Sequence, residues 1–409
     1  PNIDSIAYNG AHIVNGYVSF PVCGPSRAGF MTGRYQDRFG FTTNPTIDPT
    51  NDIAGLPLDE KTLAEVLCNE GYKSAIVGKW HLGTHPNFHP LNRGFDYFYG
   101  FLSGGHNYFM NQLTVENLEN VKSKWAWYRT KLRENHKTLE FEDYKTDYLT
   151  DELSEAALRF INKQAENDQS FFLFLSYNAP HTPMHATEKY LSRFPDIQDR
   201  KRKTYAAMVS AVDDGIGLVL ETLKKNVLIE NTIIVFLSDN GGAHNNASQN
   251  TPLRGTKGSV YEGGLRVPFA IQWKGVIPVN TKYEESVSSL DIMASMVDIL
   301  DIKPNRKKSL DGVNIIPYLT GEKQGAPHDY LFWRKWEQNA MAVIHGDHKL
   351  LKSNKRSESE IYNLKLDVSE SKNIKGSNVV LEKQLQNEWN HWNKKNIDRI
   401  FPTLGKDEW

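Results

Sequence analysis

The sequence contains five short stretches whose residue types act on anions or metal ions. The first places a thiol, Cys23, before a proline at the expected start of a helix, with Arg27 close behind. The positive end of a helix and a neighbouring arginine both lower the pKa of a thiol and attract anions. This stretch could therefore supply a nucleophile for an anionic substrate. Taken alone, the cysteine is explained more simply as a partly buried structural residue beside a surface arginine.

Two further stretches contain histidines. Lys79 and His81 lie two residues apart after an apolar run, so both side chains point to one side of a strand and can reach one anion. His181 lies between two prolines, which restrict its backbone and suit a preorganised proton-transfer group. A surface lysine, a histidine packed on Trp80 and a histidine in a turn are the structural alternatives.

The last two stretches are rich in glycine. Asp239 and Asn240 precede a glycine pair and offer oxygen ligands, which suit Ca²⁺ or Mg²⁺ better than Zn²⁺. Lys257 lies in the glycine-rich segment 253–268. An Asx turn and a flexible loop would also account for these residues.

The spacing of apolar residues predicts the elements that position these groups. Segments with helical periodicity alternate with short apolar runs. The helical segments are residues 62–71, 150–165, 203–226 and 287–300, and the apolar runs are residues 75–77, 171–176, 233–237 and 267–273. This alternation predicts an α/β fold with a mainly parallel central sheet between helices. Ligands bind at the carboxyl ends of such strands, where three of the five stretches begin.

The pattern changes after residue 303. Short strand-like runs and a final helical segment predict a smaller α+β domain with an antiparallel sheet. The runs are residues 330–333, 340–344, 349–352 and 361–362, and the helix is 379–393. We therefore expect a catalytic α/β domain over residues 1–303 and a C-terminal domain over residues 304–409.

Composition excludes several classes of protein. The 48 lysines and arginines balance 49 acidic residues, which argues against a nucleic-acid partner. No apolar run approaches the ~18 residues of a membrane-spanning helix. The 2 cysteines exclude a disulfide framework. We expect Cys68 to be a packed thiol, although a disulfide between Cys23 and Cys68 stays open.

Together the five stretches resemble the type I sulfatases of the alkaline-phosphatase-like superfamily. The matching strings are Cys-x-Pro-Ser-Arg at 23–27, Gly-Lys-Trp-His-Leu-Gly at 78–83, Asn-Ala-Pro-His at 178–181, Ser-Asp-Asn-Gly at 238–241 and Arg-Gly-Thr-Lys-Gly with Glu-Gly-Gly within 254–264. They occur in the family's order, and weaker similarities extend over nearly the whole chain. Residues 29–60 and 93–96 look most like the bacterial N-acetylgalactosamine-6-sulfatase-like group.

The resemblance implies a function and a set of roles. It implies hydrolysis of a sulfate ester by formylglycine, an aldehyde made from Cys23 by a maturation enzyme. Hydrated, this group supplies the attacking oxygen. The implied sulfate-binding and proton-transfer residues are Arg27, Lys79, His81, His181 and Lys257. The implied ligands of Ca²⁺ or Mg²⁺ are Asp239, Asn240 and residue 23.

The family's metal site also uses two adjacent aspartates on the first strand of the sheet. Either the chain is a fragment of a longer enzyme or it is a degenerate homologue without a full metal site. We expect the fragment, with these aspartates, that strand and any signal peptide upstream of Pro1. Ca²⁺ prefers 6–8 oxygen ligands, so a chain without the two aspartates would bind metal poorly and be inactive.

The implied substrate is a sulfated oligo- or polysaccharide, handled in the periplasm or outside the cell. Candidate substrate-binding side chains are arginines, histidines and aromatic residues that pair with anions or stack on sugars. They are Arg93, His106, Asn107, His185, Trp333, Arg334 and Trp336. Two alternatives stay open: a phosphate or phosphonate monoester hydrolase of the same superfamily, and a non-catalytic sulfoglycan-binding homologue. The joint presence of the thiol, lysines and histidines argues against the second.

Overall fold

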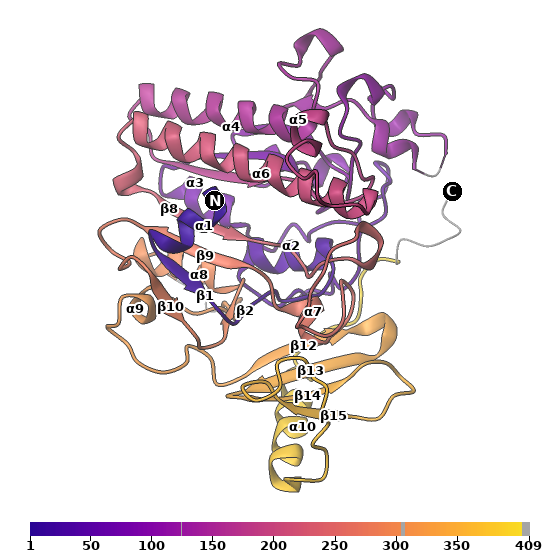
Figure 1. Cartoon of the computed structure of the whole chain (residues 1–409), viewed down its shortest axis with the longest axis vertical. Coiled ribbons are helices and arrows are strands. Elements are labelled where there is room, and N and C mark those ends of the chain that lie inside the picture. The colour runs from indigo at the N-terminus through magenta and orange to yellow at the C-terminus, as the bar shows by residue number, and fades with distance from the viewer. Residues whose placement is uncertain (124, 304–306, 403–409) are drawn as a thin grey trace.

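The computed structural model describes residues 1–123, 125–303 and 307–402 (Figure 1). The helices are α1 Asn2–Tyr8, α2 Cys23–Thr32, α3 Leu63–Asn69, α4 Leu149–Glu166, α5 Glu188–Leu191, α6 Arg200–Lys225, α7 Glu262–Leu265, α8 Asp291–Ile299, α9 Ile316–Leu319 and α10 Val379–Asn393. The strands are β1 Ala11–Ile13, β2 Gly16–Tyr17, β3 Lys73–Lys79, β4 Tyr97–Phe101, β5 Arg133–Glu134, β6 Lys137–Thr138, β7 Phe171–Ser176, β8 Ile233–Leu237, β9 Phe269–Trp273, β10 Thr281–Tyr283, β11 Val287–Ser288, β12 Leu331–Lys335, β13 Ala340–His345, β14 His348–Lys352 and β15 Glu360–Asn363. No helix among these described residues is long and apolar enough to cross a membrane.

The fold is α/β, as expected, with a central sheet region that is mostly parallel at its core. Strands β4, β3 and β7 are neighbours and parallel, and the hairpin β5–β6 extends this sheet. A second sheet has the order β10-β1-β9-β8, in which β9 runs antiparallel to both neighbours. Gly78 pairs with Ser176, so the carboxyl ends of β3 and β7 lie at one edge.

Helices cover both faces of the strands because the apolar side chains of β7 alternate. Phe171 and Leu173 pack with Ile161 of α4 and Leu220 of α6. Phe172 points the other way, into the cluster that holds residues of α3 and α8. Strand β8 divides its side chains between the same two clusters. Figure 1 shows α4 and α6 side by side on one face.

β7 and β8 each end a sheet within the described part of the chain. Both strands are apolar throughout most of their length, and their side chains are only partly buried. They pack against the same helices without pairing with each other. The central region therefore has two apolar strands whose outer edges are unpaired within the described residues.

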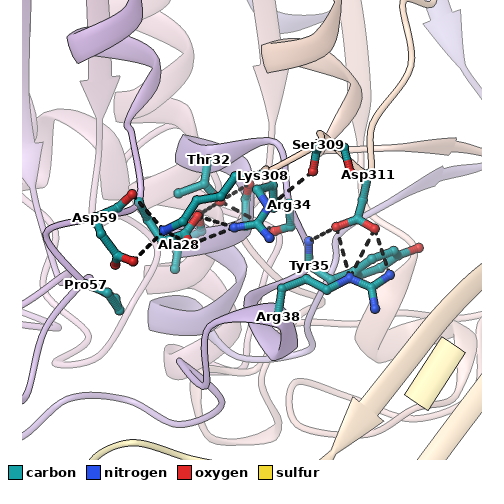
Figure 2. Close-up of polar contacts among 12 residues, drawn as sticks. Ala28, Thr32, Arg34, Tyr35, Arg38, Pro57, Asp59, Lys308, Ser309 and Asp311 are labelled. Carbon is teal, nitrogen blue, oxygen red and sulfur yellow. Dashed lines mark hydrogen bonds and ion pairs between the residues drawn. The ribbon is translucent and has the colours of Figure 1, made fainter. Parts of the chain in front are cut away.

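The segment that follows α2 is held by polar contacts to residues 309–311 (Figure 2). Arg34, two residues after the end of α2, donates to the carbonyl of Ser309 at 3.2 Å. Asp311 accepts from Arg38 at 2.8 Å. Because α2 begins at the catalytic candidate Cys23, these contacts orient the helix from its opposite end.

The C-terminal domain is an antiparallel sheet, β12-β13-β14-β15, against which α10 packs. The sheet begins only at Leu331. Residues of the preceding segment, including Ile315 and Leu319, pack with β1 and α8 of the catalytic domain. The expected boundary itself falls at residues 304–306, which lie outside the described residues, as do residues 403–409.

The segment 287–300 differs from the expected single helix. Val287 and Ser288 pair with Gly16 and Tyr17 as a short parallel strand, and α8 begins at Asp291. The Asp291 carboxylate accepts from the Ser288 amide at 2.7 Å. Strand pairing and this contact override the helical periodicity of the segment.

A buried pair of His328 and Asp291 predicts pH-dependent stability. The His328 ring nitrogen lies 2.8 Å from Asp291. Burial alone would lower the pKa of His328, but the carboxylate raises it above its usual value. A raised histidine pKa stabilises the fold fully below the unfolded pKa of ~6.5 and loses this contribution as pH rises through the folded pKa. We expect His328→Gln to lower the thermal midpoint more at pH 6 than at pH 9. An equal loss at both pH values would contradict this coupling.

Candidate active site

Strand ends bring the predicted cationic and acidic residues together. Lys79 ends β3, and Asp239 follows β8 by two residues. The Asp239 carboxylate lies 3.8 Å from Lys79 Nζ and 3.7 Å from Arg27 on α2. Burial raises the pKa of Asp239, but these cations lower it overall. The carboxylate is therefore ionised and faces two positive charges.

Arg27 is held rigidly by the ends of two strands. Its Nε donates to the Trp80 carbonyl at 2.9 Å, and its NH2 donates to Ser176 Oγ at 2.7 Å. The side chain is 6% exposed, and burial lowers its pKa. Ser176 was not a sequence candidate for the site, although its place at the end of an apolar run was a signal for it.

Lys257 contacts the thiol directly. Its Nζ donates to Cys23 Sγ at 2.8 Å. Burial lowers the pKa of Lys257, but Cys23 and Asp239 raise it above its usual value. The loop is tied down on two sides, because the Lys257 amide donates to Gly242 and the next amide donates to Pro21. The glycine-rich loop therefore carries a fixed ammonium group and is not a free surface loop.

His81 is placed by an unusual backbone conformation. Its φ of 61° lies in the left-handed region, which a non-glycine residue adopts at a cost of roughly 1–2 kcal/mol. The ring packs on Gly104, where an added Cβ would lie 2.5 Å from His81 Nε2. Burial and the nearby Lys79 hold its pKa well below the usual value. The free site therefore contains a neutral imidazole.

His181 lies at the same edge. Its Nδ1 is 2.7 Å from the Thr182 carbonyl, which can only accept, so the neutral ring carries its proton on Nδ1. Nε2 then has a free lone pair. Burial and the charges of Lys79 and Lys257 lower the pKa of His181 to about 3. An anionic ligand would oppose these charges and favour the protonated ring.

The structure offers part of a site for a hard cation. The Asn240 side-chain oxygen is buried and accepts no hydrogen bond within the described residues, and it neighbours the ionised Asp239. Two oxygen donors of this type fit Ca²⁺ or Mg²⁺. No group of three or more His, Cys, Asp or Glu side chains that could hold a metal occurs in the described ranges. The residues present thus fit such an ion but supply only part of its shell.

Three of the expected substrate-binding residues serve the fold instead. Arg93 is 1% exposed and donates to the carbonyls of Leu56 and Glu60. Both ring nitrogens of His106 lie near backbone carbonyls, one of them 2.7 Å from that of Thr130. Contacts of this kind leave these side chains no surface for a substrate.

The third, Arg334, is 8% exposed and donates to Asp37 at 2.9 Å. Trp333 is also buried and donates to the Val18 carbonyl. Trp336 is partly exposed and donates to Asp398. Arg334 and Trp333 thus join the C-terminal domain to the catalytic domain, whereas Trp336 contacts a residue of its own domain.

His185 and Asn107 lie nearer to the cluster. His185 stacks on Phe109 with ring centroids 5.5 Å apart, and burial lowers its pKa. The Asn107 amide donates to the Tyr128 carbonyl at 2.9 Å. Both stay predictions for substrate binding. Both cysteines are free, and Cys68 is exposed, so the expected packing of Cys68 is wrong.

Comparisons with known proteins show which family the chain resembles. The family model described as "Sulfatase" matches residues 1–302, and the one described as "N-sulphoglucosamine sulphohydrolase, C-terminal" matches residues 256–395. The uncharacterized sulfatase YdeN of Escherichia coli (strain K12) is 35% identical over 81% of this chain and 59% of its own length. Human N-acetylgalactosamine-6-sulfatase is 32% identical over 85% of this chain and 66% of its own. The chain thus spans about three fifths to two thirds of these relatives.

Solved structures show the same similarity over the whole fold. The crystal structure of Ps i-CgsB in complex with k-i-k-neocarrahexaose is 36% identical, with a TM-score of 0.92, over 100% of this chain and 90% of that one. The phosphonate monoester hydrolase SpPMH from Silicibacter pomeroyi has a TM-score of 0.66 at 17% identity over 97% of this chain and 91% of that one, which shows a shared fold.

The α/β fold and the similarity to solved sulfatase structures place the chain in the alkaline-phosphatase-like class of α/β proteins. Within that class, the match of the family model over residues 1–302 shows that the chain belongs to the sulfatase family.

Proposed function

We propose that the protein hydrolyses a sulfate ester of a sulfated carbohydrate. The observation that carries this proposal is the contact of Lys257 with Cys23, beside Arg27 and Lys79 at one buried edge. A sulfate monoester carries one negative charge, and its cleavage places further charge on the leaving oxygen. Fixed cations aimed at such a group stabilise the transition state more than the free substrate.

The proposed nucleophile derives from Cys23, which a maturation enzyme converts to formylglycine; its hydrate supplies the attacking oxygen. Arg27 and Lys79 bind and orient the sulfate oxygens. Lys257 reaches the position of residue 23 and can donate a proton to the leaving oxygen. His181 assists there once the bound anion raises its pKa. His81, neutral in the free site, accepts a proton during release of sulfate.

The proposed metal is Ca²⁺ or Mg²⁺, which would polarise the ester and neutralise charge. Asp239 and Asn240 would hold it together with residue 23. These three positions supply fewer than the 6–8 oxygen ligands that Ca²⁺ prefers.

The proposed substrate class is a sulfated oligo- or polysaccharide. It is supported by the similarity to human N-acetylgalactosamine-6-sulfatase and by the similar structure of Ps i-CgsB in complex with k-i-k-neocarrahexaose. A phosphonate or phosphate monoester is less favoured, because the phosphonate monoester hydrolase shares only the fold at 17% identity. We also propose a periplasmic or extracellular location and a formylglycine-generating enzyme as maturation partner.

Two measurements on the full-length protein test this function. The protein is produced with a formylglycine-generating enzyme, and mass spectrometry of the peptide containing residue 23 is expected to show the aldehyde. Ion chromatography then measures sulfate released from k-i-k-neocarrahexaose and from an aryl sulfate, with the matching aryl phosphate as control. Aldehyde formation without sulfate release from either ester would contradict the proposal, and faster phosphate release would favour the alternative enzyme.

A further inference from the structure

An aromatic ladder leads from the catalytic edge to the surface. It consists of Trp125, Trp127 and Tyr128, which precede the hairpin β5–β6 in the chain. The rings of Trp127 and Tyr128 stack with centroids 4.0 Å apart at 24°. The ring of Trp125 lies 5.9 Å from that of Tyr128 and 6.1 Å from that of Trp127. Trp127 is buried, whereas Trp125 is 57% exposed.

The inner end of this ladder borders the catalytic histidine. A Cβ added to Gly105 would lie 3.1 Å from both Tyr128 Oη and His181 Nδ1. The two side chains therefore meet across the bare backbone of one glycine. Burial raises the pKa of Tyr128, and the charges of Lys257 and Cys23 act on the same hydroxyl. The phenol thus lies within electrostatic reach of the proposed reacting groups.

The outer end is held in a strained conformation. Trp125 has a φ of 74°, which costs a non-glycine residue roughly 1–2 kcal/mol. The turn around it is closed by two backbone hydrogen bonds, from Ala126 to Ser123 and from Tyr128 to Trp125, each 3.0 Å long. The Asn107 amide also donates to the Tyr128 carbonyl. Residues 125–128 are therefore held by backbone hydrogen bonds, and the exposed side chain of Trp125 lies at their outer end.

Exposed, firmly held aromatic rings are suited to binding a pyranose ring. The axial C–H groups of a sugar pack against a flat aromatic face, and the hydroxyls and sulfates at its rim stay in water. Tyrosine and tryptophan supply such faces with little loss of conformational entropy. The centroid separation of Tyr128 and Trp125 is close to the length of one sugar unit, so adjacent units can reach both rings.

We propose that Trp125 and Tyr128 form a sugar-binding subsite that positions an oligosaccharide beside the catalytic edge. The unit that carries the scissile sulfate lies against Tyr128, and its neighbour stacks on the indole of Trp125. This inference rests on the proposed function, because it assigns the substrate's sugar ring to that site. Trp125 is then a specificity residue for chains of two or more units and does not contact a small aryl sulfate.

The test compares Trp125→Ala, Trp125→Phe and a control, Tyr8→Ala. Tyr8 is also an exposed aromatic residue, at 65%, but it ends α1, which packs against α6 and β9. For sulfate release from k-i-k-neocarrahexaose we expect Trp125→Ala to raise KM about 5- to 10-fold with little change in kcat. Its hydrolysis of an aryl sulfate should equal that of the wild type. Trp125→Phe should recover most of the loss, and Tyr8→Ala should behave as the wild type.

A binding measurement separates this inference from the proposed function. In a Cys23→Ala background, which cannot turn over substrate, calorimetry measures the Kd of the same hexasaccharide. We expect Trp125→Ala to weaken binding about 5- to 10-fold there too. Equal Kd and KM values with and without Trp125 would overturn the subsite even if the enzyme is a sulfatase. A Trp125-dependent Kd without any sulfate release would support the subsite and overturn the proposed function instead.

Discussion

Replacing Cys23 by alanine is expected to lower kcat for sulfate release by about 10⁴-fold or more, the scale seen when a catalytic nucleophile is removed. The methyl group of alanine cannot be converted to an aldehyde. The cations at Arg27, Lys79 and Lys257 would still bind the sulfate, so its affinity should change far less than turnover. Rates come from ion chromatography of released sulfate, and affinity comes from calorimetry with the hexasaccharide.

Cys68→Ala is the matched control. It removes the second cysteine, which is exposed on α3 and remote from the catalytic edge, so it should keep wild-type turnover. Near-native turnover by Cys23→Ala would exclude a nucleophile at residue 23. Loss of hexasaccharide binding together with turnover would instead indicate that the variant had lost its fold.

Replacing Lys349 by methionine is expected to destabilise the protein by about 3–5 kcal/mol, because it leaves buried carboxylates without their cation. Lys349 of β14 lies 2.8 Å from Glu262 and 3.0 Å from Glu370, and all three side chains are completely buried. Glu262 begins α7, five residues after Lys257, so this triad ties the C-terminal sheet to the catalytic loop. Chemical denaturation monitored by fluorescence measures the free energy of unfolding.

The loss should shrink as pH falls. Burial raises the pKa of Glu370, and Lys349 opposes this shift. Without the lysine we expect the pKa of Glu370 to lie further above its value in the unfolded chain. The folded form then binds protons preferentially, and its stability rises as pH decreases. Lys274→Met is the control, because Lys274 pairs with Glu230 at the surface, where an ion pair contributes less than about 1 kcal/mol. A similar decrease in the free energy of unfolding for both variants would show that the buried triad stabilises the protein no more than a surface ion pair does.

The sequence was informative where chemistry and periodicity are local. The apolar runs at 171–176 and 233–237 coincide with β7 and β8, because a strand buried on two faces must be apolar along its whole length. The catalytic candidates also lie together. Lys79 ends β3, Cys23 and Arg27 lie in the first turns of α2, and Lys257 lies in the loop before α7. The contacts among them and Asp239 range from 2.8 to 3.8 Å.

Other expectations failed because partners distant in the chain decide them. Arg93 and Arg334 have the chemistry to bind anions, but buried carbonyls and Asp37 occupy their guanidinium groups. Residues 287–288 have helical periodicity, yet they pair as a strand with Gly16 and Tyr17. The local sequence pattern does not show which residue distant in the chain will contact a given side chain or backbone amide.

The sequence by itself thus determined the family, the α/β class and the groups available to act on a sulfate ester. Only the tertiary structure decided which groups converge, and it added residues that no motif marks. Ser176 orients Arg27, and Tyr128 meets His181 across Gly105 because β4, β7 and the loop before β5 end at one edge. The physical reason is that a motif identifies which chemical groups occur near one another along the chain. A site also requires groups from different strands to lie within contact distance, and the packing of the strands and helices determines which groups do.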